Sequence, residues 1–334
     1  MNTPTIVSNL NPKLMLVLSR ALAALRPSVL AFLIAHATAL SGGTETPISF
    51  CNVLFVGNLC AAATILLCVG YKPIIADLHQ SSPRILIGFF LNGCLAALLS
   101  SLIFIGLQYT LVTNAVLIAR LGPIIYALSG ALIFGKTIFR AEWLGFSLIA
   151  VGIVTILLIS SDFSINHGDL LILGSAVVYA LTSIIGKSLL AQTASLATVV
   201  FTRNFISAVI FFAIANVVFG PGHFGDLFAG ELWIVMSIYA LIIIVLSQYL
   251  WYAALGRLDA RVVGKWSVLT PVFGIIYAFL LNGERPSPMQ LVAFAVIMAG
   301  LWITTLRKQP FAADKRALAV EEIAVRGEST ATAT

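Results

Sequence analysis

The sequence predicts an all-α integral membrane protein of ten transmembrane helices, arranged as two inverted repeats of five helices each. Three observations predict this fold. First, 60% of the 334 residues are hydrophobic and only 10% are charged, whereas soluble domains carry about 25% charged residues. Second, the apolar residues form runs of about 20, the length that crosses a bilayer as a helix. Third, residues 107–153 and 255–301 match each other at a constant offset of 148.

The elements follow in order along the chain. Residues 1–26 form a cytoplasmic N-terminal segment, in which leucines alternate with basic residues as in a short helix on the inner leaflet. The first repeat, 27–160, contains the expected spans 27–43, 49–69, 86–108, 113–134 and 142–160. The second repeat, 161–307, contains the expected spans 169–190, 196–219, 232–255, 262–281 and 289–306. Residues 308–334 are charged and then rich in Ser, Thr and Ala, which predicts a disordered cytoplasmic tail.

The internal repeat rests on residues that shape helices. Leu, Pro, Gly and Ile recur at equivalent places, namely Leu107, Leu121, Pro123, Gly135, Ile149 and Gly152 against Leu255, Leu269, Pro271, Gly283, Ile297 and Gly300. Because a unit of five spans is odd, the second copy must enter the membrane from the opposite side. Inverted repeats of this kind are typical of carriers that work by alternating access.

The distribution of positive charge predicts the orientation. Fifteen of the 19 lysines and arginines fall in segments that are inside if the N-terminus is cytoplasmic, three fall within spans, and only Arg285 falls in an outer loop. Such a bias places both termini in the cytoplasm. We therefore expect a multi-pass protein of the plasma membrane, the inner membrane in bacteria, and the net charge of +6 then reflects orientation rather than nucleic-acid binding.

Two passages of the second half resemble a known family. The segments Trp251-Tyr252-Ala253-Ala254-Leu255-Gly256, Leu269-Thr270-Pro271-Val272-Phe273 and Asn282-Gly283-Glu284-Arg285-Pro286 are similar to the repeat signature of the drug/metabolite transporter superfamily, in its ten-helix branch of two EamA-type repeats. Gly168-Asp169-Leu170-Leu171 is similar to the start of the family's second half. The first copy departs from the signature, since Phe134-Gly135-Lys136-Thr137 has Lys where the family has Glu.

The resemblance covers roughly residues 26–307 and implies a transporter with a central cavity. It is specific for fold and general activity and leaves the substrate open, because members carry amino acids, nucleotide-sugars, sugar phosphates, vitamins and drugs. It also implies that Pro123 and Pro271 lie beside the cavity, either as kinks that shape it or as hinges that move during transport.

Three cations within the expected spans are candidates for substrate binding: Arg120, Arg203 and Lys265. A charge at the centre of a bilayer costs about 2.5–3.5 kcal/mol or more, and no carboxylate lies well inside a span. An anion supplied by the substrate is then the simplest partner. Arg203 and Lys265 lie near inner ends and have the alternative of reaching the headgroups.

Arg120 has three readings. It lies three residues before Pro123, whose ring leaves a carbonyl without its helical donor. Arg120 is therefore a substrate contact, a structural partner of such carbonyls or of Asn114, or a residue of an outer gate.

Aromatic residues near these positions are candidates to line an apolar pocket, with interfacial anchoring and helix packing as the alternatives for each. They are Tyr126, Tyr179, Trp251, Trp266 and Tyr277, accompanied by Asn92, Gln248 and Tyr252. His36 is the imidazole expected within the first span and is the candidate proton site, unless it only hydrogen-bonds a neighbouring helix. Exchange or uniport fits the acid-free spans equally well.

The function we expect is transport of a small metabolite, with an anionic or zwitterionic carboxylate such as an amino acid as the leading substrate, and export as one direction. A neutral or cationic drug or vitamin is the alternative. A membrane enzyme or a receptor is the alternative of another class, although the sequence shows no catalytic motif. The four cysteines lack metal-ligand spacing, so we expect no metal and no cofactor. The expected partners are the metabolite and the bilayer, a homodimer is left open, and no nucleic acid is expected.

Overall fold

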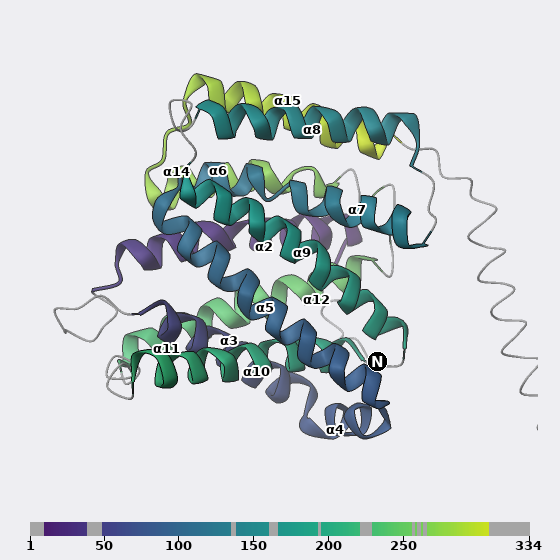
Figure 1. The fold of residues 1–334 in the computed structure, drawn as a ribbon, viewed down its shortest axis with the longest axis vertical. Coiled ribbons are helices and arrows are strands. Elements are labelled where there is room, and N and C mark those ends of the chain that lie inside the picture. The colour runs from purple at the N-terminus through teal and green to yellow at the C-terminus, as the bar shows by residue number, and fades with distance from the viewer. Residues whose placement is uncertain are drawn as a thin grey trace, which may run out of the picture.

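The computed structural model describes residues 10–38, 49–134, 138–159, 166–192, 195–220, 229–255, 258, 262 and 266–306. These described residues form helices packed side by side and contain no strand (Figure 1). The predicted all-α fold is confirmed for this part of the chain.

The helices divide at the expected boundary between the two repeats. Before it come α2 (Pro12–Ala35), α3 (Phe50–Val69), α4 (Tyr71–Gln80), α5 (Pro83–Tyr109), α6 (Val112–Ile118), α7 (Leu121–Phe134) and α8 (Arg140–Ile159). After it come α9 (His167–Ala191), α10 (Leu196–Ile214), α11 (Gly230–Tyr239), α12 (Ser247–Leu255), α14 (Thr270–Asn282) and α15 (Pro288–Thr305). Two π-helical segments extend them, η2 (Ala215–Phe219) after α10 and η4 (Ala240–Leu246) between α11 and α12.

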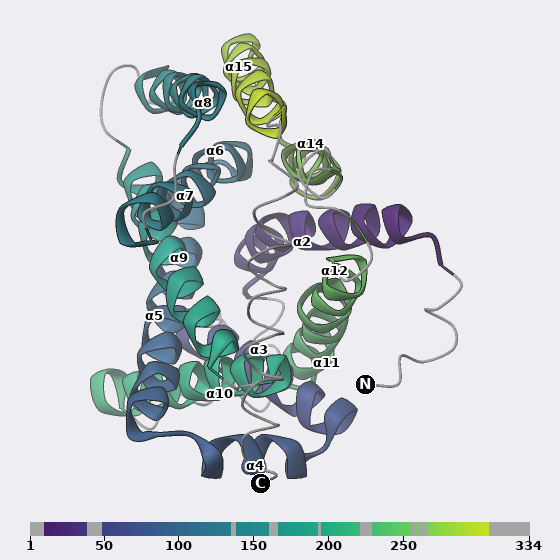
Figure 2. The same ribbon diagram turned by 90° about the vertical axis from the view of Figure 1, so that its right-hand side faces the viewer.

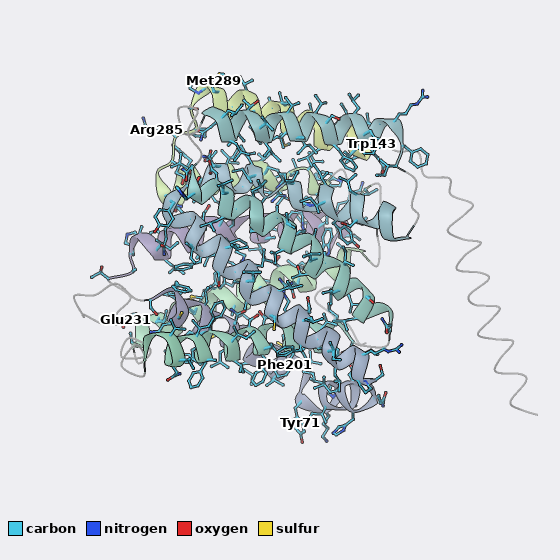
Figure 3. All side chains as sticks on the ribbon, viewed as in Figure 1. Tyr71, Trp143, Phe201, Glu231, Arg285 and Met289 are labelled. Atoms are coloured by element: carbon cyan, nitrogen blue, oxygen red, sulfur yellow. The ribbon has the colours of Figure 1, made fainter. Side chains whose placement is uncertain are left out.

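Eight apolar helical stretches of the described chain are long enough to cross a membrane. Two further apolar stretches, Gly230–Leu246 and Thr270–Asn282, are shorter and lie where the eighth and ninth spans are expected. Large apolar side chains cover the outside of the bundle, as Trp143 on α8 and Met289 on α15 show in Figure 3. An apolar outer surface of this extent is typical of a protein surrounded by lipid.

The first helix differs from the prediction. A single helix of 24 residues, Pro12–Ala35, replaces the surface helix and the span 27–43 that the sequence suggested. The basic residues misplace the boundary because protein contacts, rather than headgroups, surround their charges. Arg20 stacks over the ring of Trp251 at 3.7 Å, and Arg26 lines a cavity between the helices.

The fourth span is broken just before Pro123. Two residues separate α6 from α7. Since Pro123 has no N–H to donate to the Ala119 carbonyl, that carbonyl accepts from the Gly122 N–H instead, at 3.1 Å. The equivalent Pro271 is the second residue of α14, so each of the two repeated prolines lies in the first turn of a helix.

The helices form two rows that meet at both ends (Figure 2). One row contains α6 with α7, then α9 and α5, and the other contains α14, α2, α12 and α11. The pairs α8–α15 and α3–α10 close the two ends of the rows. Within the rows, α9 contacts α5 and α7, and α2 makes the corresponding contacts with α12 and α14.

Small residues hold α8 and α15 together. A methyl group added at Gly300 would lie 2.7 Å from the Gly145 carbonyl oxygen, and one added at Gly152 would lie 3.0 Å from the Ala293 carbonyl oxygen. These two contacts exchange under the offset of 148, which relates Gly145 to Ala293 and Gly152 to Gly300. The paired numbers run in opposite directions, so the two helices are antiparallel and related by a local pseudo-twofold axis.

Hydrogen bonds join α5 to α9 at the end of the bundle that the charge pattern predicts to be outside. Asp169 accepts from the Thr110 hydroxyl, and the Asn166 side chain donates to the Tyr109 carbonyl at 3.0 Å. Gly168 permits this approach, because an added methyl group would lie 2.8 Å from the Gly106 carbonyl oxygen. Gly168 and Asp169, at the start of the second half, therefore hold the end of α5 against the start of α9.

Glu284 ties the connection between α14 and α15 to the start of α6. Its two carboxylate oxygens accept from the backbone N–H groups of Val112 and Thr113, at 2.6 and 2.9 Å. Carboxylates stabilise helix N-termini, where backbone N–H groups lack helical partners. The counterpart of Glu284 in the first repeat, Lys136, lies outside the described residues.

Candidate functional site

A cavity of about 580 Å³ lies between the two rows of helices. Residues of α2, α3, α5, α7, α9, α10, α11, η4 and α12 line it. Its volume is in the range of sites that enclose small metabolites. Both halves of the chain therefore contribute to one cavity, as expected for a carrier built from repeats.

The charge of the cavity wall is one-sided. Arg26 of α2 and Arg203 of α10 both line the cavity, while none of its described lining residues is an aspartate or a glutamate. Asn58, Asn92, Asn204 and Gln248 add neutral polar groups. The wall thus offers positive charge and hydrogen bonds to an occupant and no negative charge.

Arg26 lies deep in the bundle. It follows Pro12 by fourteen residues on α2, which corresponds to about 21 Å along the helix axis. Its guanidinium hydrogen-bonds the side chain of Tyr239 on α11, and Tyr239 is buried. The Nε atom of Arg26 is also buried, and it has no hydrogen-bond partner among the described residues.

Four residues that the sequence nominated for substrate binding line this cavity: Tyr126, Tyr179, Arg203 and Trp251. The neutral polar residues Asn92 and Gln248, which accompany the aromatic candidates in the sequence, line it as well. The structure therefore brings together residues from α5, α7, α9, α10 and α12 that are far apart in the sequence.

Arg120 lies elsewhere. It is absent from the described wall of the cavity, and its Nε donates to the Val116 carbonyl oxygen at 3.1 Å. Of the three readings that the sequence leaves open, this geometry favours the structural partner of a carbonyl at the break between α6 and α7.

The remaining nominated residues are not among those that line the cavity. Trp266 and Pro123 are exposed, Tyr277 stacks with Phe273, and Pro271 is buried. Lys265 lies outside the described residues.

His36 follows the last residue of α2 and is exposed. Its Nδ1 lies 2.9 Å from the Phe32 carbonyl oxygen, and its ring stacks on Phe32. These contacts place the imidazole at a helix end, away from the cavity.

Sequence reasoning missed Arg26 as a site residue, together with its partner Tyr239. The signal was present in the Arg26-Pro27 pair, which places a cation beside a helix-breaking residue much as Arg120 precedes Pro123. The leucines before Arg26 continue at helical spacing into Leu30 and Leu33, which are buried. The spacing of these leucines therefore indicates one continuous span.

The comparisons with known proteins agree with the architecture. The model of the EamA-like transporter family matches residues 166–306. An uncharacterised transporter of Synechocystis sp. is 31% identical over 287 residues, covering 82% of this chain and 80% of the relative. A protein of Salmonella typhimurium named "Probable amino-acid metabolite efflux pump" is 28% identical over 183 residues, covering 52% of this chain and 60% of the relative.

A solved crystal structure shares the fold, with a TM-score of 0.55 at 20% identity, and the alignment covers 86% of this chain and 98% of the solved one. The family model accounts for the second half of the chain, and the cyanobacterial transporter for most of both halves. The chain is therefore a multi-pass membrane protein of the EamA-like transporter family, within the drug/metabolite transporter superfamily.

Proposed function

We propose that the protein carries a small anionic or zwitterionic metabolite with a carboxylate group, such as an amino acid, across the bacterial inner membrane by alternating access. The observation that carries this proposal is the cavity between the two rows, with two arginines and no carboxylate among its described lining residues.

Electrostatics favours an anionic occupant. A guanidinium removed from water loses hydration that the surrounding apolar helices do not replace. A carboxylate from the substrate compensates this loss, and the planar fork of arginine donates two parallel hydrogen bonds to it. A bound carboxylate therefore stabilises the positive charge of the cavity wall.

The packing of α8 and α15 supports the inverted arrangement of ten spans. Equivalent helices of the two halves meet antiparallel through exchanged contacts, which is the relation expected of units inserted in opposite directions. Two halves of one shape give the protein two states of similar energy, one open to each side.

The cavity extends toward the end where α9 stops and α10 begins, with Leu190 and Leu196 at that edge. The bonds between α5 and α9 join two neighbouring helices of one row at the opposite end of α9. With the orientation predicted from positive charge, the edge of the cavity at Leu190 and Leu196 lies on the cytoplasmic side. Glu231 and Arg285, which the sequence assigns to the outer side, both lie at the left-hand edge of the molecule in Figure 3, well separated along that edge.

The name of the Salmonella relative supports an amino-acid metabolite as the substrate and efflux as the direction. The aromatic side chains in the cavity wall, Tyr126, Tyr179 and Trp251, favour a second candidate, a flat neutral drug or vitamin. The two candidates differ in charge.

Counterflow separates them. Proteoliposomes loaded with a mixed pool of metabolites are offered the same pool labelled outside, and accumulation is read by mass spectrometry against protein-free liposomes. The proposal predicts accumulation of carboxylates. Accumulation restricted to neutral or cationic compounds would replace the proposed substrate class with the second candidate.

A further inference from the structure

Two buried polar atoms in the cavity wall have no partner. Among the described residues with a buried side-chain nitrogen or oxygen that lacks a hydrogen bond, only Arg26 and Asn92 line the cavity. The atoms are Nε of Arg26 and Oδ1 of Asn92. Asn92 is only 2% exposed. Folded proteins pair nearly all such atoms, since each unpaired one costs free energy.

The two atoms require opposite hydrogen-bonding partners. The Nε–H of Arg26 is a donor that requires an acceptor, and the positive charge favours an anionic one. Oδ1 of Asn92 is an acceptor that requires an N–H or O–H donor. A ligand that carries both an acidic group and a donor offers the matching group to each of these two atoms.

The other asparagines of the wall do not share this need. The Nδ2 atoms of Asn58 and Asn204 each donate to the carbonyl four residues earlier in their own helices, at 2.7 Å in both cases. The Oδ1 atom of Asn92 accepts no hydrogen bond from the described residues, whereas the Oδ1 atoms of Asn58 and Asn204 are not among the buried atoms without a partner. Among these three asparagines, only Asn92 therefore has a buried carbonyl oxygen that lacks a donor in the described part of the chain.

Tyr239 fixes the position of the guanidinium. It hydrogen-bonds Arg26 from α11, at the residue that precedes the π-helical segment η4. π-helical turns often occur at functional sites. Tyr239 acts through Arg26 and is a positioning residue.

We propose that Arg26 and Asn92 form a two-point binding site, in which Arg26 binds the acidic group of the substrate and Asn92 accepts a hydrogen bond from an amino or hydroxyl group of the same molecule. This site rests on the proposed function and narrows it to acids that also bear a donor. We therefore expect plain carboxylic acids of the same shape to bind poorly.

The test is equilibrium dialysis of the full-length protein, purified in detergent, with retained compounds identified by mass spectrometry. Three pools with matched side chains serve as probes: α-amino acids, the corresponding 2-hydroxy acids, and the corresponding plain carboxylic acids. We expect the wild type to retain members of the first or second pool about tenfold better than their plain counterparts, the value of roughly one hydrogen bond.

The variants locate the two contacts. Arg26→Gln should weaken binding of every acid by about tenfold or more, because the charge-assisted bond is lost. Asn92→Leu should abolish the preference over plain acids. Tyr239→Phe should weaken all acids while leaving that preference intact, a signature that general loss of structure does not produce.

Matched controls keep these results interpretable. Asn216→Leu removes an asparagine whose side chain donates to the Phe212 carbonyl and which does not line the cavity, and Arg84→Gln removes an exposed cation outside the cavity; neither should change retention. If Arg26→Gln does not yield folded protein, Arg26→Lys retains the charge without the fork and should still weaken binding.

Equal retention of plain and donor-bearing acids by the wild type, or retention unaffected by Arg26→Gln, would overturn the two-point site and leave an anion carrier in place. Retention of neutral or cationic compounds alone would overturn the proposed function as well.

Discussion

Arg120 completes the break between α6 and α7 with its own side chain. Its backbone N–H donates to the Leu117 carbonyl at 3.1 Å, and its Nε donates to the Val116 carbonyl. A single residue thus supplies donors to two carbonyls beside a helix interruption that Pro123 imposes. We propose that this structural task is the role of Arg120, an intramembrane cation that is absent from the described wall of the cavity.

We predict that Arg120→Gln lowers the unfolding temperature of the purified protein, because a charge-assisted bond worth about 1.5–3 kcal/mol is lost. The transport rate per folded molecule should stay within about twofold of the wild type. Thermal unfolding followed by fluorescence, with flux normalised to folded protein, measures both. A rate loss without a change in unfolding temperature would assign Arg120 to substrate binding instead.

At the scale of single elements, the short helix α4 packs on α10 through the buried Ile74 and through one carboxylate. Asp77 accepts from the Ser195 backbone N–H at 2.9 Å and from the Thr198 hydroxyl, at the start of α10. Partial desolvation raises the pKa of Asp77, but the hydrogen bonds from Ser195 and Thr198 outweigh it and lower that pKa below its ordinary value. The ionised form therefore holds α4 in place beside the cavity edge at Leu196.

This linkage fixes the sign of a pH effect. A depressed pKa in the folded state contributes stability that is present above the ordinary pKa of aspartate, near 3.9, and is lost as the pH falls through the lower folded-state value. We predict that the stability difference between the wild type and Asp77→Asn is constant from pH 7 to about pH 5 and shrinks below about pH 4. Unfolding temperatures across this range test it. A difference that persists unchanged to pH 3 would contradict the assignment.

The α8–α15 pair depends on the absence of side chains. At Gly300 an added methyl group would lie 2.7 Å from the Gly145 carbonyl oxygen and 3.0 Å from the Ile149 backbone nitrogen, and backbone atoms cannot move aside cheaply. We predict that Gly300→Ala destabilises the protein by about 1–3 kcal/mol. Gly174→Ala is the control, because its nearest neighbour would lie 3.9 Å away. Equal unfolding temperatures for the two variants would show that this pair separates freely.

Periodicity predicted most of the helices, because the length of an apolar run and the positions of Pro and Gly depend on where a helix begins, breaks and ends. Periodicity misplaced the start of α2, because Arg20 and Arg26 contact Trp251 and Tyr239 on other helices. Such contacts cannot be recognised from spacing along the chain. The same limit applies to the site. Which of several intramembrane cations lines the cavity depends on helix rotation, and helix rotation is set by packing across the bundle rather than by spacing along the chain.

At the scale of the whole molecule, the two rows of helices enclose a positive cavity. The pairs α8–α15 and α3–α10 join equivalent or near-equivalent parts of the two halves, and the cavity lies between these joints. Under the proposed function, an anion in the cavity would lie between Arg26 from one half and Arg203 from the other. The substrate charge is therefore placed where it senses both halves, as coupling between binding and a change of state requires.

The most direct test of this account is the initial rate of carboxylate counterflow into proteoliposomes, normalised to folded protein, for the wild type, Arg26→Gln and Arg120→Gln. Counterflow requires a site that is exposed to each side in turn. The account predicts at least a tenfold loss for Arg26→Gln, the effect of about 1.4 kcal/mol, and a rate near the wild type for Arg120→Gln. A reversed order, with Arg120→Gln inactive and Arg26→Gln active, would place the anion outside the cavity and contradict the account.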